Sequence, residues 1–276
     1  MEDSVRPLVL CADDYADSAG VSQAVCQLAQ AGRLSATSVM ALAPRWREDA
    51  APLRELRARL DVGLHLDLTS SFALAAGCGM SLGAAMRRAL LGQFQRTAVR
   101  ACIERQLDAF EAAWQAAPDH VDGHQHVQQF AGIREPLVEL LAQRYGPRPP
   151  WLRVSRPPAG QAGGKGWLIA RMGADALESI ASRQGLASSK WLLGIYDFKG
   201  GEAAYARRMA GWLAQAPAAA VLMCHPATGQ DEPGDPIGAA RPWEFAHLAG
   251  PAFAAQCAAA GVRLARGSAL YTAARS

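Results

Sequence analysis

The chain has 276 residues and a mass of 29.2 kDa, close to the roughly 250 residues that are typical of one α/β barrel. Hydrophobic residues make up 50% of it and charged residues 19%, which provides for a packed core and excludes a chain that is disordered throughout. The formal net charge is only +3 and the charges are interspersed, so no nucleic-acid-binding surface is expected. These values predict a single domain over residues 1–276.

Short apolar segments alternate with longer segments of helical spacing. The predicted strands are Leu8–Ala12, Ser38–Leu42, Val62–Leu66, Asp119–Val121, Trp151–Val154, Trp191–Ile195, Ala219–Cys224 and Val262–Leu264. The predicted helices are Val21–Ala31, Asp49–Leu60, Thr97–Ala116, Arg134–Tyr145, Ala174–Gln184, Glu202–Ala214 and Pro242–Ala259. This alternation predicts an α/β protein with a parallel sheet, and its count of about seven or eight repeats favours a closed or nearly closed (β/α) barrel over an open doubly wound sheet.

Two segments interrupt the alternation. Arg156–Gly166 is rich in proline and glycine and is expected to be a loop on the rim of the barrel. Ser70–Gln95 begins with small residues and is expected to end in a short helix. Both segments are predicted to shape a substrate groove.

The location of the protein is predicted from its cysteines and its apolar runs. Its six cysteines are scattered without a C-x-x-C pair, which is typical neither of a zinc knuckle nor of a disulfide framework. The first apolar run, Leu8–Ala12, is too short for a signal peptide, and no run approaches the roughly 18 apolar residues of a membrane span. A cytoplasmic protein without a membrane span is expected, and a homodimer is compatible with the sequence.

Two adjacent carboxylates, Asp13 and Asp14, stand where the first predicted strand ends. Neighbouring side chains of an extended segment point to opposite sides, which favours one carboxylate for a metal ion and the other for proton transfer. The alternative is that one caps the next helix or that both are solvated turn residues. The residues by themselves leave both interpretations open.

Histidines follow three further predicted strands: His65 in GLHLDLT, His124 and His126 in DGHQHV, and His225 in MCHP. His124 and His126 would face the same way on an extended segment, so their spacing leaves them as competing ligands. It excludes a zincin helix, which needs H-E-x-x-H. The His65-x-Asp67 spacing also matches the iron oxygenases that use two histidines and one carboxylate.

All four motifs lie at the carboxyl ends of different predicted strands. In a parallel barrel these ends meet at one mouth, where the catalytic groups of this architecture lie. Two imidazoles and one carboxylate suit a divalent ion that keeps open positions for water and substrate. The motifs therefore predict a catalytic metal site rather than a closed structural one.

The motifs ADDY with the helix start at Gly20-Val21, GLHLDLT, DGHQHV and MCHP resemble, in kind and order, those of the YdjC/ChbG-like carbohydrate deacetylases. That family includes relatives linked to hopanoid biosynthesis, and the resemblance runs from Leu8 to the C-terminal strand. It implies a distorted, TIM-like (β/α) barrel. It also implies a hydrolase that removes the acetyl group from N-acetylglucosamine units with a divalent ion, commonly magnesium; zinc would also suit the ligands.

Carried over residue by residue, the resemblance implies that Asp14, His65 and His124 bind the ion. It implies that Asp13 is the general base and His225 the general acid. The chain departs from the family in two places, which leaves its substrate open. Family members commonly have glycine at the position of Ala16 and histidine at that of Gln128, and both positions are expected to line the mouth.

Three further charged residues are expected to support the site. Arg153 would orient Asp13 or contact the sugar, or else lie solvated on the rim. Asp67 and Asp122 would fix the tautomers of the imidazoles.

Two alternative functions are weighed against a deacetylase. A protein that binds an acetylated sugar without turnover would keep the cavity but not the chemistry. An iron oxygenase with His65 and Asp67 is disfavoured, because such enzymes are usually built on antiparallel sheets.

Overall fold

The computed structural model describes residues 5–158, 160, 163–229 and 234–271. Its strands are β1 Arg6–Tyr15, β2 Ala36–Val39, β3 Asp61–Leu66, β4 His120–Gly123, β5 Trp151–Leu152, β6 Leu192–Leu193, β7 Ala220–Cys224 and β8 Val262–Leu264. Its α-helices are α1 Ala19–Gln30, α2 Trp46–Arg54, α3 Ser71–Ala75, α4 Leu82–Leu91, α5 Arg96–Trp114, α6 Arg134–Tyr145, α7 Gly164–Arg171, α8 Ala174–Arg183, α9 Gly201–Gln215, α10 Arg241–Ala249, α11 Pro251–Ala259 and α12 Gly267–Leu270. Two 3₁₀ segments are η1 His124–Gln129 and η2 Gly238–Ala240.

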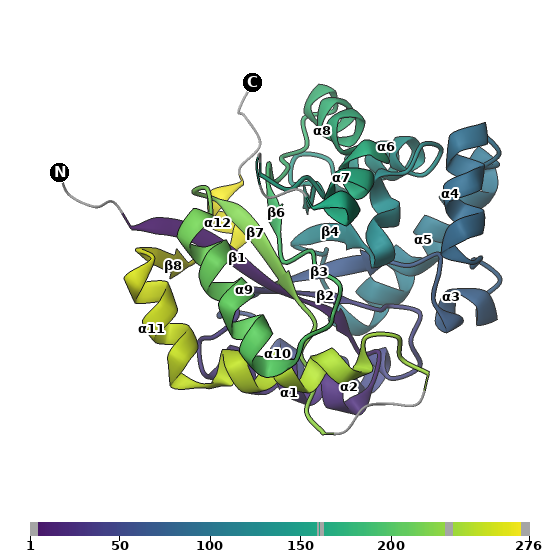
Figure 1. Ribbon diagram of the computed structural model, residues 1–276. Coiled ribbons are helices and arrows are strands. Elements are labelled where there is room, and N and C mark those ends of the chain that lie inside the picture. The colour runs from purple at the N-terminus through teal and green to yellow at the C-terminus, as the bar shows by residue number, and fades with distance from the viewer. Residues whose placement is uncertain (1–4, 159, 161–162, 230–233, 272–276) are drawn as a thin grey trace.

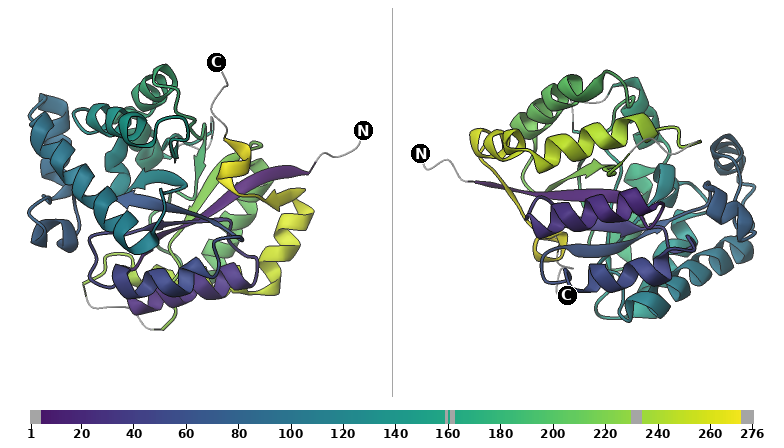
Figure 2. Two further views of the ribbon diagram at one scale, coloured as in Figure 1. Left: turned by 180° about the vertical axis from the view of Figure 1, so that it is seen from behind. Right: turned by 90° about the horizontal axis from the view of Figure 1, so that it is seen from below.

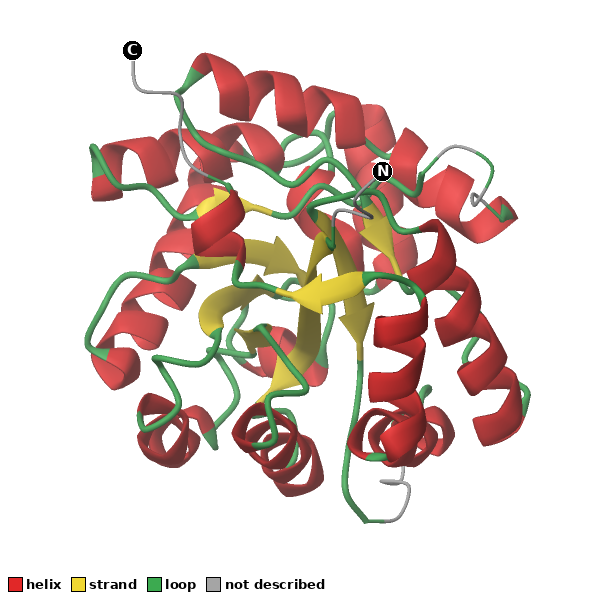
Figure 3. Ribbon diagram, turned by 90° about the vertical axis from the view of Figure 1, so that its left-hand side faces the viewer, coloured by secondary structure: helices red, strands yellow, loops and turns green. Residues whose placement is uncertain are grey.

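The strands form one parallel sheet in the order β5-β4-β3-β2-β1-β7-β6, with β8 attached to β1. Helices surround the strands, which lie at the centre of the molecule (Figure 3). Neighbouring helices pack side by side around this sheet, α1 against α2 and α2 against α5 in one direction and α1 against α10 in the other (Figures 1 and 2). The predicted α/β fold, a distorted barrel, is confirmed.

The distortion has two sources. Leu8 of β1 pairs with Ala220 of β7 and also with Leu264 of β8, so β8 lies along the opposite edge of β1 instead of between β7 and β1. The two-residue strands β5 and β6 do not pair with each other. An isolated parallel bridge joins Leu152 of β5 to Ser188, and the N–H of Leu192 in β6 donates to the carbonyl of Arg156 at 2.7 Å. The barrel is therefore held together there by irregular backbone.

The burial of strand β1 explains why its sequence is apolar from Leu8 to Ala12. The strand is buried from Leu8 to Tyr15, as a central parallel strand is on both of its faces. Val9 and Cys11 pack with Trp151 in a small cluster, whereas Leu8 and Leu10 belong to the large core shared with the helices. The alternation of side chains thus separates the inside of the barrel from its helical layer.

Several predicted boundaries are wrong for local reasons. The predicted helix Pro242–Ala259 is two helices, because the backbone of Gly250 is extended before Pro251, which starts α11. The predicted loop Arg156–Gly166 lies partly outside the described residues, and its end is the first turn of α7. The insertion at 70–95 contains two helices, α3 and α4, instead of one. None of the described helices is both long enough and apolar enough to cross a membrane.

We predict that Gly63→Ala destabilises the fold. A Cβ at Gly63 in β3 would lie 2.5 Å from atoms of the buried His120 ring, which is itself stacked on Trp151. Overpacking of this kind costs about 1–3 kcal/mol. The matched control is Gly211→Ala in α9, where a Cβ meets nothing within 4 Å and should stabilise the helix by about 0.5–1 kcal/mol. Urea unfolding measures both; an unchanged midpoint for Gly63→Ala would contradict the prediction.

Candidate active site

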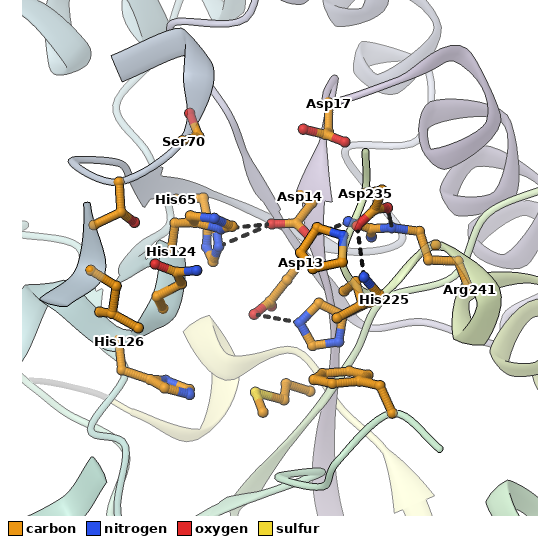
Figure 4. A pocket seen from close by; sticks show the side chains of 18 of the residues that line it. Asp13, Asp14, Asp17, His65, Ser70, His124, His126, His225, Asp235 and Arg241 are labelled. Atoms are coloured by element: carbon orange, nitrogen blue, oxygen red, sulfur yellow. Dashed lines mark hydrogen bonds and ion pairs between the residues drawn. The ribbon is translucent and has the colours of Figure 1, made fainter. Parts of the chain in front are cut away.

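A cavity of about 780 Å³ opens at the carboxyl ends of the strands. Five residues from the sequence motifs that were expected to act in the site line it together: Asp13, Asp14, His65, His124 and His225. They come from β1, β3, the start of η1 and the end of β7 (Figure 4). The expected convergence at one mouth is therefore present in the structure.

The two aspartates lie in a distorted stretch of β1. The pairing of β1 with β2 shifts register between Ala12 and Tyr15, and Asp14 has a φ of 66° in the left-handed region. Bulges of this kind re-aim side chains and are common beside active sites. Asp13 and Asp14 have different partners, as expected, but the bulge rather than regular strand alternation separates them.

Asp14 lies between two imidazoles. Its Oδ1 atom is 3.3 Å from Nε2 of His65 and 3.3 Å from Nδ1 of His124. One ligand atom from each of the three side chains lies within 4.8 Å of the others, which is compatible with a bound metal ion. His65 and Asp14 are buried, and His124 is half-buried at the cavity wall.

The environment of His65 favours a positive charge. Its Nδ1 is 2.7 Å from Oδ1 of Asp122 and 3.1 Å from Oγ of Ser38, which leaves Nε2 directed at Asp14. Burial by itself would lower the pKa of His65, but Asp122 and the other nearby carboxylates raise it to about 10. A carboxylate behind a histidine is the usual arrangement for a metal ligand, and it confirms the expected contact of Asp122.

His124 and His126 do not face the same way, so the premise of an extended segment is wrong. Gln125 and His126 have φ values of 53° and 63°, and the chain coils after β4. His126 places its Nδ1 3.0 Å from Oγ of Ser155, away from Asp14. Burial and the nearby Arg153 cation lower the pKa of His126 to about 3, so it is neutral. Among the described residues, the groups able to hold a metal include His124 but not His126.

Asp13 is held by Arg153. The guanidinium reaches the two Asp13 oxygens at 2.6 and 2.7 Å, and its Nη1 is 2.9 Å from Oδ2 of Asp122. Arg153 is fully buried, so the alternative of a solvated rim residue is wrong. Although burial raises the pKa of Asp13, Arg153 lowers it, and the net shift is below the ordinary value. Asp13 is therefore anionic at neutral pH.

His225 lies beside this ion pair. Its Nε2 is 3.8 Å from Oδ2 of Asp13, and its ring packs edge-on against Phe198 with centroids 5.3 Å apart. Its backbone N–H donates to Oε2 of Glu244 at 2.6 Å. Asp13 and His225 thus border the same part of the cavity.

Three expectations around the mouth are wrong. Asp67 accepts hydrogen bonds from the N–H groups of Thr69 and Ser70 at 2.9 Å, which orders the start of α3, so it neither supports an imidazole nor completes an iron site with His65. Gln128 is buried behind the wall, where it donates to the carbonyl of Arg153 at 3.0 Å. Ala16 is also buried, and its φ of 72° is a value at which glycine is favoured.

The sequence reasoning missed Arg241, Asp235, Asp17 and Glu244. Nη2 of Arg241 is 2.9 Å from Oδ2 of Asp14, and the other side of the guanidinium contacts Asp235. Asp17 lines the cavity, and burial together with Asp14 raises its pKa to about 6. None of these residues follows a strand directly, apart from Asp17 in the turn after β1, so the strand-end criterion gave no signal for the rest.

Comparisons with known proteins agree with these motifs. The family model described as YdjC-like protein matches residues 7–259. A carbohydrate deacetylase of Homo sapiens is 30% identical over 293 residues, covering 93% of this chain and 88% of the relative. A chitooligosaccharide deacetylase of Serratia marcescens is 28% identical over 226 residues, covering 80% of this chain and 81% of the relative.

A solved structure supports the fold. A protein of Enterococcus faecalis V583, described as a candidate cellobiose-phosphate cleavage protein, superposes with a TM-score of 0.71 and covers 98% of this chain and 100% of its own. Its sequence identity is 18%, so this likeness shows the fold alone. The family model spans nearly all of the chain and the motifs meet at one cavity: the chain belongs to the YdjC-like family.

Proposed function

We propose that the protein is a metal-dependent hydrolase that removes the N-acetyl group from an N-acetylglucosamine-containing saccharide or glycoconjugate. One observation carries this proposal: the Asp14, His65 and His124 cluster lines one cavity together with Asp13, which forms an ion pair with the buried Arg153. The relatives named carbohydrate deacetylase and chitooligosaccharide deacetylase support the same reaction.

The residues present fit a divalent ion. Asp14, His65 and His124 would hold it, and the carboxylates that favour a cation at His65 would favour a metal ion equally. Magnesium is the ion that the resemblance implies, but two imidazoles and one carboxylate are a donor set typical of zinc and similar borderline ions. When bound, such an ion supplies a Lewis acid that polarises a carbonyl oxygen and acidifies water.

Asp13 would accept the proton of the attacking water. As an anion fixed by two hydrogen bonds from Arg153, its carboxylate is held in one orientation toward the cavity. The guanidinium also lowers the pKa of Asp13, so the contact that orients this carboxylate also makes it a weaker base.

His225 would donate a proton to the departing amine. Imidazole is suited to this step because it exchanges protons near neutral pH. Its Nε2 is 3.8 Å from Oδ2 of Asp13, so base and acid border the same part of the cavity, where the amide would bind.

The acetylated amino sugar would bind in the cavity, whose volume falls in the range of about 300–1,000 Å³ that is usual for small-molecule sites. The cavity is lined by the charged side chains described above and by aromatic side chains, among them Phe72, Phe130 and Phe198. We further propose that the chain acts as one domain over residues 1–276 in the cytoplasm. All six cysteines are unpaired, which supports a reducing compartment.

We predict that Asp14→Ala, His65→Ala and His124→Ala each abolish tight binding of a divalent ion. Loss of a residue that only supports a metal ligand lowers the affinity for the ion by about 10–100-fold, so loss of a direct ligand should lower it further. His126→Ala is the matched control and should bind as the unmodified protein does, because His126 faces Ser155. Titration calorimetry with Zn²⁺ measures the affinities. Loss of binding in His126→Ala with retention in His124→Ala would reverse the assignment.

We predict that Asp13→Asn retains the ion but lowers the rate of deacetylation by about 10²–10⁴-fold. The amide keeps the shape of the side chain but cannot accept the proton. Release of acetate from N-acetylglucosamine oligomers measures the rate at matched metal occupancy. Near-normal turnover would show that another group acts as the base.

We predict that His225→Ala slows an amide substrate far more than an activated aryl acetate. A phenolate leaves without a proton, whereas an amine needs one, so the loss should be selective by about 10²-fold or more. The rates on an N-acetylglucosamine oligomer and on an aryl acetate give the comparison. Equal losses on both would remove the role of general acid from His225.

A further inference from the structure

Arg241 and Glu244 lie one turn apart at the start of α10. We propose that they are positioning residues: Arg241 aims Asp14 at its place beside His65 and His124, and Glu244 fixes the backbone that carries His225. This inference rests on the proposed function, since it assigns the support of the same site.

Arg241 bridges two carboxylates. Its Nη2 is 2.9 Å from Oδ2 of Asp14 and its Nε is 2.5 Å from Oδ2 of Asp235, and it is only 5% exposed. A guanidinium offers donors on separate edges of a rigid plane, which a lysine ammonium does not. Arg241 is therefore held in place by Asp235 while it holds Asp14.

Because Arg241 contacts one oxygen of Asp14, the two oxygens of this carboxylate have different partners. Oδ2 accepts from Arg241, while Oδ1 faces the nitrogens of His65 and His124 at 3.3 Å. Figure 4 shows Asp14 with the imidazoles on one side and Arg241 on the other. With Oδ2 held by Arg241, Oδ1 is the oxygen that faces the imidazoles, and this contact assigns the orientation of the carboxylate to Arg241.

Glu244 performs the equivalent task for the other half of the site. Strand β7 ends at Cys224, so the N–H of His225 lies beyond the strand and needs another acceptor. Oε2 of Glu244 accepts this N–H at 2.6 Å, and Oε1 accepts the hydroxyl of Tyr196 at 2.6 Å. The hydroxyl of Tyr205 lies 3.4 Å from Oε2. Glu244 is 1% exposed, and these donors fix it from two directions.

The two residues are separated by three positions, which places them on neighbouring parts of one helix surface. Helix α10 itself packs against α9, α11 and α1. One helix end thus anchors both the Asp14 side and the His225 side of the cavity, and it can act on them separately. Arg241 should affect the binding of an ion, whereas Glu244 should affect only the step that His225 serves.

The first half of the test is a titration of Co²⁺ followed by its visible absorption, which needs no turnover. Arg241→Gln and Arg241→Lys should each weaken Co²⁺ binding by about 10–100-fold, and Asp235→Asn should weaken it less. Arg156→Gln is the matched control, because Arg156 also pairs with two carboxylates, Asp175 and Glu178, but does not line the cavity. It should bind Co²⁺ as the unmodified protein does.

The second half uses Glu244→Gln. Co²⁺ affinity should stay within about twofold, while kcat on an N-acetylglucosamine oligomer should fall by about tenfold or more with little change in KM. The rate on an aryl acetate should be largely retained, as for His225→Ala. Glu111→Gln is the control, because Glu111 also accepts from a tyrosine, Tyr145, outside the cavity.

The outcomes distinguish a failure of these positioning roles from a failure of the proposed function. Wild-type Co²⁺ affinity in Arg241→Gln or Arg241→Lys overturns the role of Arg241, and equal losses on amide and ester in Glu244→Gln overturn that of Glu244. Neither result affects the proposed function. If the unmodified protein binds Co²⁺ without needing Asp14, the proposed function fails and this inference fails with it. Far-UV circular dichroism checks that each variant is folded. If Arg241→Gln is unfolded, Asp235→Asn replaces it, and an unchanged Co²⁺ affinity in Asp235→Asn overturns the role of Arg241.

Discussion

The site depends on the buried cation of Arg153, which contacts Asp13 and Asp122 at once. Bringing charges into a protein interior costs several kcal/mol per ion unless partners compensate them. Asp13, Asp122 and Arg153 are all almost inaccessible to solvent, so each is tolerated only in the presence of the others. Removing any one of the three would therefore leave the others buried without a full set of partners.

From this centre the same charges reach the rest of the site. Asp122 contacts His65 as well as Arg153, and His65 in turn contacts Asp14. The carboxylates outnumber the cations at this point, which raises the pKa of His65 and favours a positive charge beside Asp14. A binding place for a divalent ion and an oriented carboxylate base thus share one electrostatic arrangement.

Backbone irregularity lets the barrel present this network to the cavity. Regular strands would direct alternate residues to opposite faces, but the bulge at Asp13-Asp14 and the coil at Gln125-His126 place residues in left-handed conformations. Such conformations cost of order 1–3 kcal/mol each for residues other than glycine, and they persist where surrounding contacts determine them. At Asp14, Gln125 and His126 they coincide with the mouth of the barrel.

The sequence determined the alternation of strands and helices and the strand ends at which Asp13, Asp14, His65, His124 and His225 stand. These features follow from local periodicity, because the burial of a strand or of one helix face sets the spacing of apolar residues along the chain. Helix Arg134–Tyr145, for example, has the bounds that its pattern predicts. The meeting of the strand ends at one cavity follows from the parallel topology that this pattern implies.

Tertiary structure alone decided which side chains touch. The separation of His124 from His126 depends on two left-handed residues that spacing does not encode. Arg241 meets Asp14 across 227 positions of the chain, and β8 lies on an unexpected edge of β1. Contacts between distant segments depend on how helices and loops pack around the sheet, and each has many alternatives of similar local propensity. The sequence thus determined which groups are brought to the mouth, and packing decided how they are paired.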